Sequence, residues 1–203
     1  MFTRRLASVA AVLCILPASL WAADIKSGPD VGKDLPGPFH PFNVTGKEAG
    51  NFHCVVCTKE LDPGVLVFVR NSAFSDKLAK FLEELDKAVA ASPKARINAA
   101  AIFLFDDLKN VVTDDVNRRK YAEKLEALGA APAKLDHIIL ALDSADGPKD
   151  YGISPDAKVT VLITSRLQVV AKFVYTDEEA LDAAATAAIV AAVKEKLGAP
   201  AKK

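Results

Sequence analysis

The amino-acid sequence predicts an α/β fold, a central mixed β-sheet flanked by helices on both faces and preceded by a β-hairpin extension. Patterns typical of buried strands alternate with helical patterns along most of the chain, and two late strand patterns are separated by only two residues. Strands that alternate with helices form parallel β-α-β units, whereas a two-residue connection imposes antiparallel pairing. The order of elements therefore indicates a sheet that combines both kinds of pairing.

The chain before this alternation is rich in proline and glycine. Residues 23–41 are predicted to form an extended lead-in, because proline fixes the backbone in extended or turn conformations. Residues 42–60 are predicted to form the β-hairpin extension, with two short strands around Gly46 and Gly50. The main domain is accordingly placed at 42–198, with the hairpin as its first element.

The remaining elements follow from hydrophobic periodicity. Continuous apolar runs predict three buried strands, at 65–70, 97–105 and 137–142. Apolar residues at helical spacing, N-cap residues and acidic first turns predict three helices, at 75–91, from 113 to about 129, and at 178–197. The late hairpin joins strands 158–164 and 167–175, and the second of these is expected near a sheet edge because polar residues share one of its faces.

The two ends of the chain are assigned to other roles. Residues 1–22 have the pattern of a secretory signal peptide, with Arg4 and Arg5 before an apolar run and small residues before the cleavage point. We therefore expect an exported protein, periplasmic or extracellular, without a membrane segment after signal cleavage. Residues 199–203 are expected to be a short tail.

Charge and motifs exclude several classes of function. The 26 Lys and Arg residues balance the 26 Asp and Glu residues, and no basic stripe suggests a nucleic-acid partner. Glycine-rich phosphate loops, nucleophile elbows and zinc-protease helices are absent from the sequence. We expect no bound cofactor.

Three stretches carry a family resemblance: "VGKDLPGPFHPFNVTGKEAG", "GVLVFVRNSAF" and "YGISPDAKVTVLIT". In this order and spacing the chain resembles the thioredoxin-like superfamily, particularly its exported peroxiredoxin-like or thiol-disulfide reductase-like branch, over about residues 31–198. The resemblance implies a thioredoxin-like sandwich fold and a partner that is another thiol or disulfide protein.

The chain departs from this family at both of its active-site landmarks. The family's reactive cysteines follow the central strand, at the N-terminus of the next helix, where the helix dipole lowers a thiol pKa. The matching stretch here is "NSAFSDK", residues 71–77, which contains no cysteine. The family's cis-proline directly precedes the "TVLI"-like strand, near Ala157 or Lys158, and Pro155 stands two or three residues too early.

The candidate catalytic residues are Cys54 and Cys57, which lie upstream of the central strand. As a redox pair they would cycle between dithiol and disulfide, with Cys54 favoured as the attacking thiol because His53 adjoins it and could modulate it. Alternatively, the domain is a non-catalytic scaffold or binding module with a structural disulfide, or the pair binds metal with His40 and His53. Haem attachment is rejected, because Thr58 stands where a histidine is needed.

Other candidates have plainer interpretations. Asp106-Asp107 and Asp114-Asp115 could suggest a cation site, but such residues are more often turn formers and helix-start acids. His137 is expected at a strand edge or surface, and Asn43 begins a glycosylation sequon.

Overall fold

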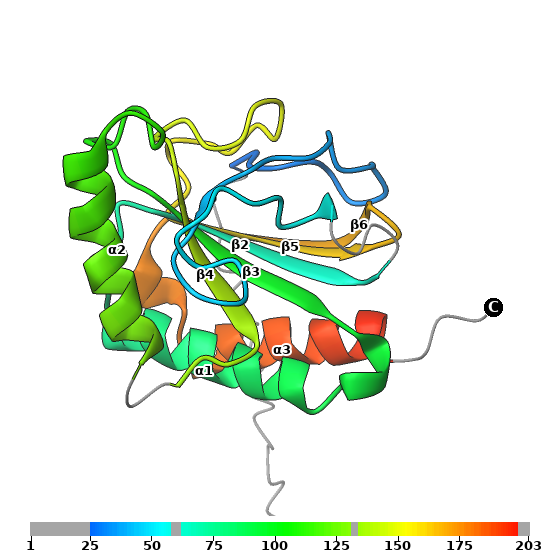
Figure 1. Cartoon of the computed structure of the whole chain (residues 1–203). Helices are drawn as coiled ribbons and strands as arrows, with labels where there is room; N and C mark the ends of the chain where they lie inside the picture. Colours follow the sequence, from blue (N-terminus) through cyan, green and yellow to red (C-terminus); the bar gives the residue numbers. More distant parts are fainter. Residues whose placement is uncertain (1–24, 58–61, 131–133, 199–203) are drawn as a thin grey trace, which may run out of the picture.

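The computed structural model describes residues 25–57, 62–130 and 134–198 (Figure 1). The predicted signal peptide and the predicted tail lie outside the described residues, as do residues 58–60 of the predicted hairpin extension. Within the described part of the chain, no helix has the length and apolar character needed to cross a membrane.

A mixed six-stranded sheet forms the centre of the fold, in the order β1-β4-β3-β2-β5-β6. The parallel strands β2, β3 and β4 meet antiparallel β5 on one side and antiparallel β1 on the other, and β6 pairs with β5 as an edge strand. The mixed pairing and the edge position of β6 are as predicted. The strands are β1 (Phe42–Asn43), β2 (Gly64–Arg70), β3 (Asn98–Leu104), β4 (Ile138–Asp143), β5 (Val159–Ser165) and β6 (Gln168–Tyr175).

Three helices begin at side-chain caps. Helices α1 (Asp76–Ala90) and α2 (Asp115–Gly129) lie close to their predicted positions, and α3 (Ala183–Leu197) follows β6. In each case a serine or aspartate side chain accepts a hydrogen bond from a first-turn N–H, which satisfies one of the free backbone donors of the helix end. The predicted start of the last helix at residue 178 is wrong, because Asp182 caps α3 and a short 3-10 turn precedes it.

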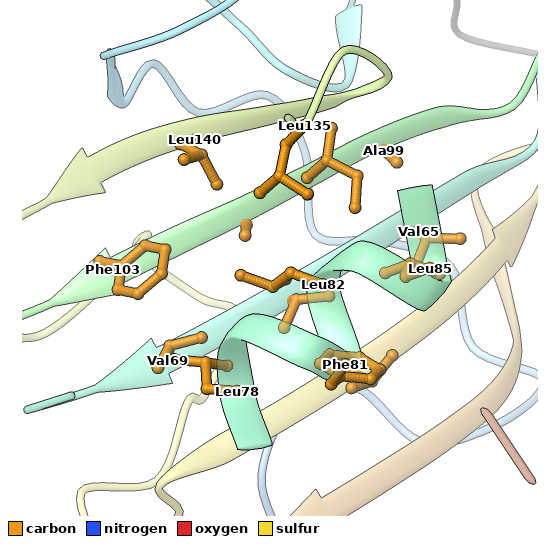
Figure 2. Close-up of a cluster of buried hydrophobic side chains, with 14 of the residues drawn as sticks. Val65, Val69, Leu78, Phe81, Leu82, Leu85, Ala99, Phe103, Leu135 and Leu140 are labelled. Atoms are coloured by element: carbon orange, nitrogen blue, oxygen red, sulfur yellow. The ribbon is translucent and has the colours of Figure 1, made fainter. Parts of the chain in front are cut away.

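The expectation of helices on both faces of the sheet is wrong for the described residues. Buried residues of α1, α2 and α3 all join one core cluster on one face (Figure 1). Successive right-handed crossovers from β2 to β3 and from β3 to β4 advance in the same direction across the sheet, so they place both connecting helices on the same side. Figure 2 shows this core, where side chains of α1 lie against those of the central strands. Its labelled members from α1, β2 and β3 are Leu78, Phe81, Leu82, Leu85, Val65, Val69, Ala99 and Phe103.

The opposite face is covered by chain without α-helix. The lead-in crosses it and packs Phe39 onto the sheet beside Tyr151, with ring centroids 5.0 Å apart. The Tyr151 hydroxyl donates to the Gly37 carbonyl at 2.7 Å, and the Gly28 N–H donates to the Gly152 carbonyl at 3.0 Å. The extended lead-in is therefore an integral wall of a second core.

The N-terminal hairpin is present in a reduced form. Phe42 in β1 forms an isolated bridge with Phe52, and the Asn43 N–H donates to the Asn51 carbonyl at 2.9 Å. Strand β1 also pairs with β4, so the hairpin extends the main sheet. Asn43 is 1% exposed, which removes its sequon from enzymatic glycosylation in the folded state.

Candidate functional site

Cys54 and Cys57 form a disulfide with an S–S distance of 2.06 Å. Cys54 is 4% exposed, whereas Cys57 is only partly buried. The backbone N–H of Cys57 donates to the Cys54 sulfur at 3.1 Å. The two cysteine residues therefore differ in exposure, and a backbone donor points at the sulfur of the buried one.

The loop between the cysteines is anchored by contacts that do not involve sulfur. Val55 is buried in the second core, and its carbonyl accepts a hydrogen bond from the side-chain amide of Asn98. Asn98 begins β3 and stands opposite Gly64, the first residue of β2. The disulfide loop thus lies at the end of the sheet where the parallel strands start.

This position is at the opposite end of β2 from the start of α1. Helix α1 follows the C-terminal end of β2, a strand of seven residues. At about 3.3 Å per residue, β2 separates the start of α1 from the disulfide loop by roughly 20 Å. A helix dipole acts over its first turn, so the dipole of α1 does not reach the disulfide loop.

Cys57 forms part of the wall of a hollow of about 120 Å³. None of the residues that line it carries a charge, and they come from the lead-in, the disulfide loop and the turn between β5 and β6. They are Leu35, Gly37, Pro38, Val56, Cys57 and Leu167. The partly buried Cys57 thus borders an apolar hollow.

The histidines named with this pair lie in the lead-in and in the hairpin arm. His53 is partly buried, and its backbone N–H donates to the Pro41 carbonyl at 3.2 Å, while His40 is exposed. Both sulfurs are used in the disulfide. Within residues 25–57, 62–130 and 134–198, no three histidine, cysteine or acidic side chains gather as a metal site would require. Modulation of Cys54 by His53 stays a prediction.

The start of α1 is occupied by a carboxylate. Glu178 is 6% exposed, and its two oxygens accept hydrogen bonds from the N–H groups of Ala73 at 3.2 Å and Ser75 at 3.5 Å. Ser75 itself caps α1 by accepting from the Leu78 N–H at 3.2 Å. Glu178 therefore places a carboxylate at the start of α1, a position that favours negative charge.

Sequence reasoning missed Glu178 because the acidic run before Asp182 was assigned to the last helix. The available signal was Asp182, whose type is typical of an N-cap and indicates that α3 begins after it. Glu178 then lies before the helix, where its side chain can make tertiary contacts. The two residues directly before β5 are Ala157 and Lys158, so no proline stands there.

The other acidic candidates have structural partners. Asp106 exchanges hydrogen bonds with Asn71, through its carboxylate at 2.7 Å and its N–H at 2.9 Å. Asp107 accepts from the Tyr121 hydroxyl at 2.6 Å, which holds the pKa of Asp107 below its usual value. Asp114 caps α2. These contacts agree with turn and helix-start roles.

Two ionisable residues, His137 and Asp143, lie at the two ends of β4. His137 precedes β4 and is half-exposed, with its Nδ1 3.0 Å from a carboxylate oxygen of buried Asp86. At the other end of β4, burial raises the pKa of Asp143 to about 6, although the Ser144 N–H donates to its carboxylate at 2.7 Å.

Replacing Glu178 with alanine should lower the free energy of unfolding by about 2 kcal/mol, because two N–H groups at the start of α1 lose their acceptor. Glu179→Ala is the matched control, since the Glu179 carboxylate lies at the surface 2.9 Å from Lys77. The control should cost less than about 1 kcal/mol. Urea unfolding of both variants provides the measurement, and equal losses would contradict the role given to Glu178.

Asp143→Asn should stabilise the protein at neutral pH. Because the folded-state pKa of Asp143 is raised to about 6, the folded state binds this proton more tightly than the unfolded state. Stability therefore falls as pH rises from about 4 to 6, by up to about 3 kcal/mol, and the variant lacks this loss. The free-energy difference between variant and wild type should grow over that interval and level off above it; a difference independent of pH would contradict the assignment.

Comparison with known proteins identifies solved structures that have the same fold. No family model matches the sequence, and no curated protein matches it. Solved structures do match in fold. A putative thiol:disulfide interchange protein DsbE from Chlorobium tepidum superposes with a TM-score of 0.52 at 16% identity, over 86% of this chain and 99% of that one.

Two further structures give the same result. A thiol:disulfide interchange protein from Bacteroides sp. has a TM-score of 0.52 at 12% identity, covering 85% of this chain and 93% of its own. The exposed lipoprotein thioredoxin Etrx1 from Streptococcus pneumoniae has a TM-score of 0.50 at 11% identity, covering 78% and 99%. At these identities the comparisons establish the fold.

Proposed function

Since the chain has the thioredoxin-like fold, we propose that it is an exported thiol-disulfide protein whose Cys54–Cys57 pair exchanges with a partner protein. Export is supported by the signal pattern of residues 1–22 and by the fold shared with an exposed lipoprotein thioredoxin. The observation that carries the redox proposal is the asymmetry of the pair, with Cys57 bordering an open hollow and Cys54 buried beside a backbone donor.

This asymmetry assigns different roles to the two sulfurs. A thiolate of the partner attacks the Cys57 sulfur, the bond to Cys54 breaks, and Cys54 leaves as a thiolate that accepts the Cys57 N–H. Hydrogen bonding to the charged form favours a thiolate, so the leaving group is stabilised. Cys57, rather than Cys54, is thus the residue that forms the mixed disulfide.

A second partner thiol completes the exchange. It attacks the partner's sulfur in the mixed disulfide and releases Cys57, so that the partner gains a disulfide and the pair becomes a dithiol. Two electrons and two protons pass from the partner's thiols to Cys54 and Cys57. The reverse sequence reduces a partner disulfide, and the relative reduction potentials of the two proteins set the direction.

The anchored loop is compatible with both states of the pair. The burial of Val55 and the hydrogen bond from Asn98 hold the backbone without help from sulfur. The chain-entropy contribution of so short a disulfide loop is about 2 kcal/mol, less than half that of a long loop. Reduction should therefore leave the fold intact.

The second candidate is a non-catalytic module with a structural disulfide. Burial of Cys54 favours it, since a buried sulfur exchanges slowly, and so does the Glu178 carboxylate at the family's usual site. In this alternative the pair only fixes the conformation of the loop that contains it.

Two single-cysteine variants separate the candidates. In Cys54→Ser the remaining Cys57 thiol should form a stable mixed disulfide with oxidised glutathione, whereas in Cys57→Ser the buried Cys54 should react at least about tenfold more slowly. Mass spectrometry of the folded variants over time gives both rates.

Circular dichroism and urea unfolding confirm that both variants are folded under the assay conditions. Two unreactive variants would contradict the redox proposal and favour the structural disulfide. Faster reaction at Cys54 would overturn the roles given to the two sulfurs.

A further inference from the structure

One wall of the hollow beside Cys57 contains a residue, Leu167, with an unfavourable backbone conformation. Leu167 contributes to this wall and is 37% exposed, in the turn between β5 and β6. Its φ of 63° and the φ of 52° at Arg166 are left-handed, a conformation that bulky residues rarely adopt. Two-residue turns of this kind strongly prefer Asn-Gly or Asp-Gly. A leucine there raises the free energy of the turn while holding an apolar side chain at the surface.

The Leu35 N–H and the carbonyls of Gly37 and Leu167, all in the same wall, already have partners. The Leu35 N–H donates to the Leu167 carbonyl at 2.7 Å, and the Gly37 carbonyl accepts from Tyr151. A bound segment therefore meets mainly apolar side chains, those of Leu35, Pro38, Val56 and Leu167, instead of a free strand edge.

From these observations we propose that the hollow is a docking surface for one kind of partner segment, a cysteine flanked by aliphatic residues. This inference rests on the proposed function, because the disulfide in the wall is what selects a thiol as the bound group. An aliphatic side chain next to the partner's cysteine would displace water from this hollow, whose volume is about 120 Å³. Displacing water from apolar walls supplies the affinity.

Leu167 is thus a specificity-determining residue, while Cys57 carries out the exchange. Leu167→Asn is the informative variant because asparagine tolerates the left-handed conformation and replaces the apolar side chain with a polar one. Its stability should equal or exceed that of wild type. Val31→Asn is the matched control, since Val31 is an exposed apolar residue of the lead-in, 58% exposed, that does not line the hollow.

The test compares two synthetic peptides and glutathione as reductants of the disulfide in the full mature chain. One peptide carries a cysteine between leucine and valine, and the other carries it between serine and glycine, with identical charges and length. Wild type and Val31→Asn should react about fivefold faster with the aliphatic peptide, as partial burial of one aliphatic side chain implies. Leu167→Asn should react equally with both peptides, whereas Val31→Asn should keep the wild-type rate with glutathione.

The outcomes distinguish this inference from the proposed function. Reduction by glutathione together with equal peptide rates in wild type would overturn the docking surface and leave the redox proposal standing. A peptide preference that persists in Leu167→Asn would overturn the role of Leu167. Failure of all three thiols to reduce the folded protein would overturn the redox proposal itself.

Discussion

The structure depends on how the second face of the sheet is covered. Helices α1, α2 and α3 all pack on one face, and apolar residues of β2 and β3 on the other face also require shielding from water. The lead-in and the segment before β5 supply that cover, with Phe39 and Tyr151 packed against each other on the sheet. Because this wall has no α-helix, side-chain packing and hydrogen bonds to other segments hold it in place.

The disulfide loop belongs to this wall, which explains both its position and its asymmetry. Val55 packs in the second core and the adjacent Cys54 is buried, while Cys57 lies at the border of the apolar hollow. At the other end of the sheet, the Glu178 carboxylate occupies the start of α1. The start of α1 is therefore occupied by a carboxylate, and the Cys54–Cys57 disulfide lies about one strand length away.

Local patterns were sufficient for most of the fold. The strands and the first two helices follow from apolar periodicity and from caps such as Ser75 and Asp114, because those signals act within a few residues. The placement of all three helices on one face was not predicted, because it depends on the order of the strands in the sheet, which the order of elements along the chain does not give. The Cys54-Cys57 pair was recognised as displaced because the central strand could be located.

Features of the site that depend on tertiary contacts could not be read from the sequence. The unequal burial of Cys54 and Cys57, the amide of Asn98 on the loop and the apolar wall with Leu167 all join segments far apart in the chain. Glu178 was hidden for the same reason, since its hydrogen-bond donors lie more than 100 residues earlier. Such contacts need the folded arrangement, not a local pattern.

The most direct test of the displaced redox site is the reduction potential of the Cys54–Cys57 pair in the folded mature protein, measured by equilibration with glutathione or thioredoxin-type redox buffers. A pair that exchanges with partners should have a potential above about −300 mV and interconvert reversibly while the protein stays folded. A potential below that value, with reduction only on unfolding, would contradict the account and identify the disulfide as a structural bond.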